Sequence, residues 1–504
     1  MKRKYMLFSL LGVLMVKFGF VQQKTINNIA CLVCISIWYI LCEAIDFGDI
    51  NENPNGPTVA VTSQLLTEAQ KAIGNSVVTS VKGILFTQQL TEGQYPSSSR
   101  YTGLTSNYNG WYTGPIQNLN EIIKINRDED LMTTAEAFGD NNNQIAVAKI
   151  IRAFLLQNIT DRWGALPWTE AFQGIDFPQP KFDTQEELYN YMFVEVDEAL
   201  SLINIDNSGP KGDLIFNGNM SRWKTFANTL KMTMALRISD ANPSLAKSKF
   251  EAAIAGGVIK SNSENILFNF GADDGSDNPW QDRFESRVDY LLSETLANAL
   301  RTNQDPRLFK YVEPSRDGSI SETNFPNGID AKYVGAPNGY VNGNVQDYSL
   351  PTRTVTGNQR YKSPIYTSAQ VKLSLAEAKL KGWSIGSGTV ESLLKEGIEE
   401  SMRFWGVDEL DINAYTDAHT SATLADIAYE KWVALYLNGP EAWAEWRRLD
   451  MPVLIPSGNA VDPRIPVRDA YDSSIEDNNS ANYASIISIQ GPDNLHTKLW
   501  WDKN

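Results

Sequence analysis

The sequence predicts a mainly α-helical protein with long ordered loops, and three observations support this prediction. Apolar residues recur at helical spacing, for example at Trp223, Phe226 and Leu230. Residues that start and stop helices flank such segments. The alternation of apolar and polar residues that is typical of half-buried strands is rare.

Helix starts can be placed from capping signals. An apolar face through residues 65–73 predicts an early helix. Thr184 with Glu187, and Thr367 with Gln370, fit capping boxes, in which two side chains satisfy the free amides at a helix start. We therefore expect helices to begin just after Thr184 and Thr367.

Two further regions predict how the helices pack. The apolar segment 145–159 contains few polar residues and should lie deep between other helices. Gly439 and Pro440 separate the helical segments 427–437 and 441–449. Two helices joined by so short a break suit a scaffold built from helix pairs.

Two long stretches, 270–289 and 311–363, are rich in Gly, Pro, Asn and Asp and are predicted to be ordered loops. Loops of this length are uncommon in a compact domain unless they carry binding surface. Their aromatic side chains are therefore candidates for ligand contacts.

The N-terminus is typical of an exported protein. Basic residues 2–4 precede an apolar run at 6–16, and a second apolar run covers 29–41. Each run is shorter than the roughly 20 apolar residues that a membrane span needs, whereas a charged start and a short apolar run are secretory. Met15 is an alternative start, because the second run would then follow its own basic region.

The cysteines of the chain, Cys31, Cys34 and Cys42, all lie in this region, so the remainder can form no disulfide and no cysteine metal site. Cys42 is followed by polar chain and resembles the processed cysteine of a lipoprotein. We predict that residues 1–42 are a signal peptide and that Cys42 is lipidated. Cys31, which follows the small residue Ala30, is the alternative, and a cleaved signal without lipid is another.

The overall charge argues against nucleic acid as a partner. The formal net charge is -16 and the sequence pI is about 4.8. A phosphate backbone would be repelled by such a field.

No catalytic, metal or cofactor motif stands out. His419 and His496 are the histidines of the chain, and neither lies in an HExxH motif. Segment 49–60 begins with the D-x-N-x-N spacing of a calcium loop, but Pro54 and Ala60 stand where Gly and the last ligand belong. We therefore predict no enzyme, no metal and no cofactor. A surface glycoside hydrolase, which needs two carboxylates at a set separation, is the least favoured alternative.

Several short motifs follow one another from about residue 46 to the C-terminus. They are found at 46–55, 111–112, 120–123, 161–171 (DRWGALPWTEA), 217–219, 222–228, 305–308, 333–339, 430–436 (EKWVALY), 441–443, 447–448 and 463–468 (PRIPVR). Jointly, and in this order, they resemble the SusD/RagB family, in particular its SusD-like starch-binding branch.

The resemblance implies a SusD-like helical fold with tetratricopeptide-like helix pairs, in which residues 43–504 form a single binding domain. It also implies a lipid-anchored protein on the surface of the outer membrane, with a SusC-like TonB-dependent transporter as partner. Such a protein would capture an oligosaccharide, or a peptide as in RagB-like relatives, and close over the barrel by a hinge. A helical-repeat scaffold for other proteins is the alternative function.

Sugar rings present apolar faces edged by hydroxyls, so a binding platform needs exposed aromatic rings beside polar groups. One segment with this mixture precedes the predicted helix at 117–125. Its candidate residues are Tyr95, Arg100, Tyr108, Trp111 and Tyr112. The resemblance favours Trp111, because the starch binder of the family has a Trp in the corresponding region. The alternative is a core Trp that fixes the helix.

A second candidate segment lies in the predicted loop 270–289. It contains Trp280, Asp282 and Arg283, which we expect to face Tyr340. A core role is the alternative here as well. Five other tryptophans lie at helical spacing or within motifs and are predicted to be core, namely Trp163, Trp168, Trp223, Trp432 and Trp443.

Overall fold

The computed structural model describes residues 60–102, 104, 106–317, 325 and 330–504. Within it, Val61–Asn504 form one compact unit. Cys31, Cys42 and most of segment 49–60 lie outside the described residues, so the predictions of a signal peptide, of its lipidated cysteine and of the domain boundary after residue 42 stay predictions.

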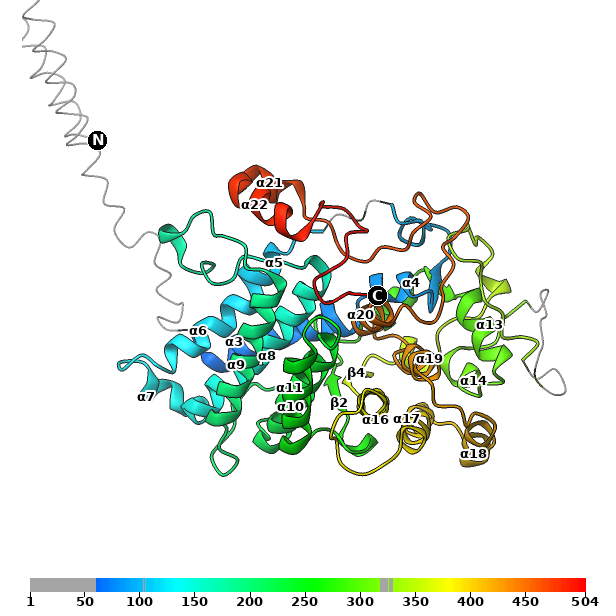
Figure 1. Ribbon diagram of the computed structural model, residues 1–504, viewed down its shortest axis with the longest axis horizontal. Coiled ribbons are helices and arrows are strands. Elements are labelled where there is room, and N and C mark those ends of the chain that lie inside the picture. Colours follow the sequence, from blue (N-terminus) through cyan, green and yellow to red (C-terminus); the bar gives the residue numbers. More distant parts are fainter. Residues whose placement is uncertain (1–59, 103, 105, 318–324, 326–329) are drawn as a thin grey trace, which may run out of the picture. The chain divides into compact units, whose positions relative to one another are not determined.

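Most long helices pack in pairs, which confirms the predicted fold class (Figure 1). The pairs are α3 (Thr62–Ala72) with α6 (Gln117–Ile125), α8 (Asn141–Trp163) with α9 (Gln185–Leu202), α10 (Met220–Arg237) with α11 (Pro243–Gly256), α16 (Ser368–Leu380) with α17 (Val390–Phe404), and α19 (Leu424–Ala434) with α20 (Gly439–Leu449). Helix α10 also contacts α8, α9 and α16, and so joins the pairs of the N-terminal half to those that follow.

The other described helices lie outside these pairs. They are α4 (Lys82–Phe86), α5 (Asn109–Trp111), α7 (Met132–Ala135), α12 (Pro279–Glu285), α13 (Glu294–Thr302), α14 (Leu308–Tyr311), α15 (Arg353–Thr356), α18 (Glu409–Ala418), α21 (Ser473–Asn478) and α22 (Ser480–Gln490). In the described residues, the strands form two antiparallel ladders. They are β1 (Leu90–Glu92) with β3 (Tyr290–Leu292), and β2 (Ile266–Asn269) with β4 (Lys362–Tyr366).

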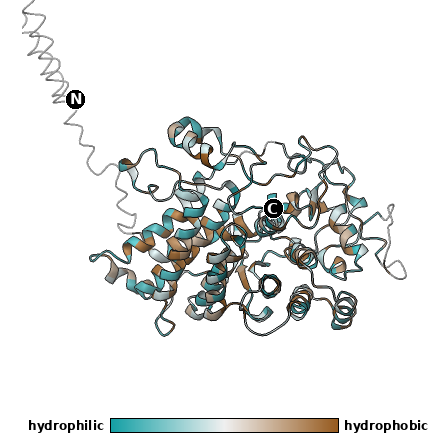
Figure 2. Ribbon diagram, in the orientation of Figure 1, coloured by the Kyte–Doolittle hydropathy of each residue, from teal (hydrophilic) through white to brown (hydrophobic). Residues whose placement is uncertain are grey.

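The buried apolar side chains of the described residues form two clusters. The first is centred on α8 and α10, and it includes the predicted core segment 145–159. The second gathers around α4, α13, α19 and α20. Figure 2 shows brown, hydrophobic positions along the helices of the interior and teal positions on the outer turns. The two ladders pin loops to this framework, because β1 pairs with β3 across about 200 residues of sequence.

The capping predictions are confirmed in one case and corrected in part in the other. Thr184 and Glu187 form the reciprocal capping box of α9. Thr367 caps α16 by accepting a hydrogen bond from the Gln370 amide. The side chain of Gln370 does not complete a box, because it donates instead to Glu441 Oε1 at 3.1 Å.

Some glycine and proline residues that the sequence predicts to lie between helices in fact form the first turn of a helix. Gly439 and Pro440 form the first turn of α20, where the missing N–H of proline costs nothing. Asn278 likewise caps α12, whose first residue is Pro279, inside the predicted loop 270–289. Apart from α12, α15, a single 3-10 turn at Val345–Asp347 and the start of β4 at Lys362, the described parts of the two predicted loops are irregular, as expected.

Candidate functional site

The aromatic residues before α6 lie against the first core cluster. Tyr108 is buried and packs edge-on against Trp163, with the ring centroids 6.0 Å apart. The half-buried Tyr112 donates a hydrogen bond to the carbonyl oxygen of Pro167 at 2.6 Å. Trp111 is also half-buried and packs against the same cluster. The structure thus gives Trp111 both a packing contact and an exposed part.

A cavity of about 290 Å³ opens between this segment and the C-terminal helix α21. Tyr108 and Tyr112 line one wall, and prolines, small side chains and three amide side chains line the rest. The amide residues are Asn109, Asn478 and Asn479. Trp111 lies next to this cavity in sequence but does not line it. The arrangement offers an aromatic floor with hydrogen-bonding groups at its edge.

A second group brings together Tyr95, Arg100 and Tyr340 from distant parts of the sequence. Arg100 Nε donates to the carbonyl oxygen of Gly339 at 2.7 Å, and the amide of Asn342 donates to that of Gly93 at 2.9 Å. The sequence groups Tyr340 with segment 280–284, whereas its loop is bonded to the segment that carries Tyr95. These two tyrosines are 59% and 46% exposed, which makes them accessible aromatic platforms.

The other predicted residues, around Trp280, are more deeply placed. Trp280 is 1% exposed and packs edge-on against Tyr290, so its indole is out of reach of a ligand in this conformation. The Arg283 guanidinium lies 4.9 Å from the Trp280 ring centroid, and burial lowers the pKa of Arg283. Its Nη1 has no hydrogen-bond partner among the described residues. Asp282 is exposed to solvent.

Arg287 connects the two predicted segments, and the sequence analysis did not single it out. Its guanidinium lies 5.3 Å from the ring centroid of Tyr95 and forms an ion pair with Asp289 at 2.7 Å. The pair holds a positive charge beside an exposed aromatic ring, an arrangement that suits sugar hydroxyls. The one feature of the sequence that could have pointed to Arg287 is its position in the predicted binding loop 270–289.

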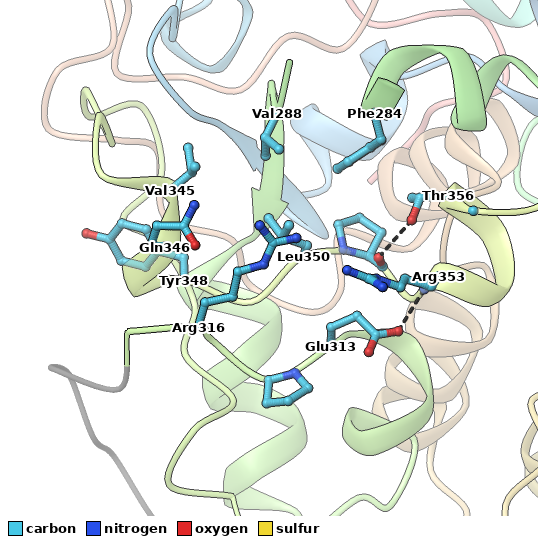
Figure 3. A pocket seen from close by; sticks show the side chains of 13 residues that line it. Phe284, Val288, Glu313, Arg316, Val345, Gln346, Tyr348, Leu350, Arg353 and Thr356 are labelled. Atoms are coloured by element: carbon cyan, nitrogen blue, oxygen red, sulfur yellow. Dashed lines mark hydrogen bonds between the residues drawn. The ribbon is translucent and has the colours of Figure 1, made fainter. Parts of the chain in front are cut away.

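A cavity of about 490 Å³ lies beside this group and is drawn in Figure 3. Val288 and Val345 line it, and the backbone of Gly93 fits closely against the same two residues. Phe284, which follows Arg283 on α12, forms part of another wall. The cavity therefore adjoins both predicted segments without containing any of the predicted side chains.

Phe172 is a further aromatic residue that sequence reasoning missed. It is 40% exposed, adopts a left-handed backbone with φ of 65°, and stacks on Tyr112 with centroids 5.3 Å apart. A bulky residue in that conformation is uncommon, and such strain is concentrated at functional sites. With Trp168 and Tyr191 it lines a cavity of about 660 Å³. No sequence pattern foretold this backbone conformation.

Within the part of the chain that the structure describes, no group of three or more His, Cys, Asp or Glu side chains could hold a metal ion. No described helix is both long and apolar enough to cross a bilayer. Aromatic rings, amide side chains and arginines are among the groups that line the described cavities.

The fold is mainly helical, and it carries exposed aromatic side chains on its loops. Residues 54–472 match the model of a family, SusD-like_2, described as starch-binding and associating with the outer membrane. The match covers most of the chain, and the protein belongs to this family.

Solved structures agree with this assignment. A chitin-binding protein shares 25% identity and superposes with a TM-score of 0.75, covering 88% of this chain and 100% of its own. A SusD homologue from Bacteroides fragilis shares 21% identity, with a TM-score of 0.74 and coverage of 88% and 100%. A chitin-binding SusD homologue from Flavobacterium johnsoniae shares 22% identity, with a TM-score of 0.68 and coverage of 88% and 97%. No curated protein matches the chain.

Proposed function

We propose that this protein captures oligosaccharides at the cell surface, held there by a lipid on Cys42, and delivers them to a SusC-like TonB-dependent transporter. The observation that carries the proposal is the pair of exposed tyrosines, Tyr95 and Tyr340, on neighbouring loops of a SusD-like fold. The structure that matches at 25% identity is that of a chitin-binding protein, which supports a glycan as the ligand.

Binding by this site needs no covalent chemistry. The faces of sugar rings would stack on Tyr95 and Tyr340, while Arg287 and nearby amides hydrogen-bond the hydroxyls. Asn338, two residues before Tyr340, supports this role. Both polar atoms of its amide are buried without a hydrogen-bond partner among the described residues, so a water or a ligand group would have to supply one.

Trp111→Ala is expected to weaken binding of an oligosaccharide ligand by about 1–3 kcal/mol, the scale of one lost aromatic contact. Calorimetric titration with chito-oligosaccharides measures the effect. Trp111→Phe serves as the control, because it keeps an aromatic ring and most of the packing against the first core cluster. Unchanged affinity in a folded Trp111→Ala variant would show that Trp111 does not contact the ligand.

The lipid anchor makes a separate prediction. Cells that express the protein and are fed a fatty-acid analogue should label it, and Cys42→Ala should abolish the label. Label that survives in Cys42→Ala but disappears in Cys31→Ala would transfer the anchor to Cys31. An unlabelled wild-type protein would contradict lipidation altogether, without bearing on glycan binding.

A further inference from the structure

The cavity of Figure 3 is built by chain segments that hydrogen bonds hold in place. The amide of Glu313 donates to the carbonyl oxygen of Leu350 at 2.8 Å, and that of Arg316 donates to the carbonyl oxygen of Gln346 at 3.0 Å. Helix α12 packs on α15 and closes another side. The volume of about 490 Å³ is within the range of roughly 300–1,000 Å³ that is typical of small-ligand pockets.

Two arginine side chains supply the charge of this cavity. Arg316 and Arg353 enter it from different segments, and in Figure 3 their guanidinium groups point toward each other across the space. Neither guanidinium is hydrogen-bonded or ion-paired to another residue that the structure describes. Two like charges that face one another repel unless an anion lies between them.

The acidic residue of the cavity does not neutralise this pair. Glu313 Oε1 accepts a hydrogen bond from the backbone amide of Arg353 at 2.7 Å and one from the Thr352 hydroxyl at 3.2 Å. Glu313 is thus engaged in fixing the start of α15, and it forms no ion pair with Arg316 or Arg353. One carboxylate against two guanidinium groups leaves the cavity positive, in a chain whose net charge is -16.

Apolar and amide groups complete the lining. The rings of Phe284 and Tyr348 border the same space, and the Gln346 amide lies beside Arg316 (Figure 3). An aromatic ring can stack on the face of a sugar, and a guanidinium group can bind a carboxylate through two parallel hydrogen bonds. The combination therefore matches a sugar ring that carries a carboxylate.

We propose that this cavity binds the carboxylate of an acidic sugar, so that the captured glycan contains uronic acid residues. This inference rests on the proposed glycan-binding function and adds the class of sugar. Arg316 and Arg353 would hold the carboxylate, while Phe284 or Tyr348 contacts the ring. Arginine suits this task better than lysine because its planar group matches carboxylate geometry.

The test compares two trisaccharides, one of galacturonic acid and one of galactose, by calorimetric titration of the full chain. Wild-type protein is expected to bind the acidic trisaccharide about tenfold or more tightly than the neutral one, as charge-assisted hydrogen bonds require. The preference should shrink at high salt because the arginines are exposed. Titration with a sulfated galactose oligomer shows whether the cavity is specific for carboxylates or binds any anionic sugar.

Arg316→Gln/Arg353→Gln should abolish the preference for the acidic trisaccharide. Arg360→Gln is the matched control, since Arg360 is exposed and does not line the cavity. Equal affinity for the two trisaccharides, or a preference that persists in the double variant, would overturn the inference. Binding of neutral sugars alone would also overturn it while leaving glycan capture intact, and binding of neither trisaccharide would overturn it as well.

Discussion

Arg448→Met is expected to lower the free energy of unfolding by about 3–5 kcal/mol, because it leaves buried carboxylates without their main partner. Arg448 forms ion pairs with Glu377 at 2.6 Å and with Glu445 at 2.7 Å. Lys431 contacts the same two carboxylates at 2.5 and 2.8 Å. These four charges are buried and join α16, α19 and α20, so the loss should appear in global denaturation by urea.

Arg403→Met is the matched control. Arg403 pairs with Glu409 at 2.7 Å, but both side chains are exposed, and such a pair is worth about 0–1 kcal/mol. A loss in Arg448→Met no larger than that of the control would show that the buried network contributes little.

The network should also respond to acid. Burial alone would raise the pKa of Glu377, but the charges of Arg448 and Lys431 outweigh this effect and hold that pKa at about 2. Its stabilisation is therefore present above the unfolded value of 4.5 and is lost as the pH falls from 4.5 toward 2.

Asp502→Asn is expected to stabilise the protein by about 1–3 kcal/mol at pH 8. Asp502 is 4% exposed, and its carboxylate forms an ion pair with Lys498 at 3.5 Å. Burial raises the pKa of Asp502 to about 6, because the nearby positive charges of Lys498 and Arg447 lower this pKa by less than burial raises it. The folded state thus holds the proton of the Asp502 carboxyl group more tightly than the unfolded state, in which the pKa of this group is 3.8. Ionisation above pH 6 opposes folding, and the penalty is absent below pH 3.8.

The gain from Asp502→Asn should therefore grow as the pH rises from about 4 to 6 and stay constant above it. Thermal unfolding at pH 4 and pH 8 measures the difference. Asp450→Asn is a suitable control, because Asp450 contacts the same Lys498 at 3.8 Å but is exposed. A gain of equal size at both pH values would show that it does not arise from the ionisation of Asp502.

The fold class and the local signals could be predicted because they depend on neighbours in sequence. The capping box of Thr184 and Glu187 spans one helical turn, and the buried stripe of α8 follows from composition. The role of the motif residues could not be predicted in the same way. Lys431 belongs to a recognisable motif, but its partner Glu377 is 54 residues away in the sequence. Only the packing of α16 on α19 brings the two together.

The sequence could not predict which aromatic side chains of the candidate site are exposed to solvent. Trp280 and Tyr95 both lie in loop-like segments with similar composition. Trp280 is buried against Tyr290 because β3 pairs with β1, whereas Tyr95 extends beyond the end of β1 into solvent. Phe172 was missed because neither its left-handed backbone nor its stacking on Tyr112, 60 residues earlier in the chain, is visible in the sequence. The cavity with Arg316 and Arg353 likewise arises from pairing between separate segments.

Glycan capture by the exposed tyrosines is the central claim, and calorimetric titration of the full chain with oligosaccharides tests it most directly. The panel should contain chito-, galacto- and galacturono-oligosaccharides, with unrelated peptides of similar mass alongside. We expect saturable binding of at least one oligosaccharide, intact sugar after incubation, and loss of binding in Tyr95→Ala/Tyr340→Ala with unfolding behaviour unchanged. Binding confined to peptides, release of shorter sugars, or full affinity in the double variant would contradict the account.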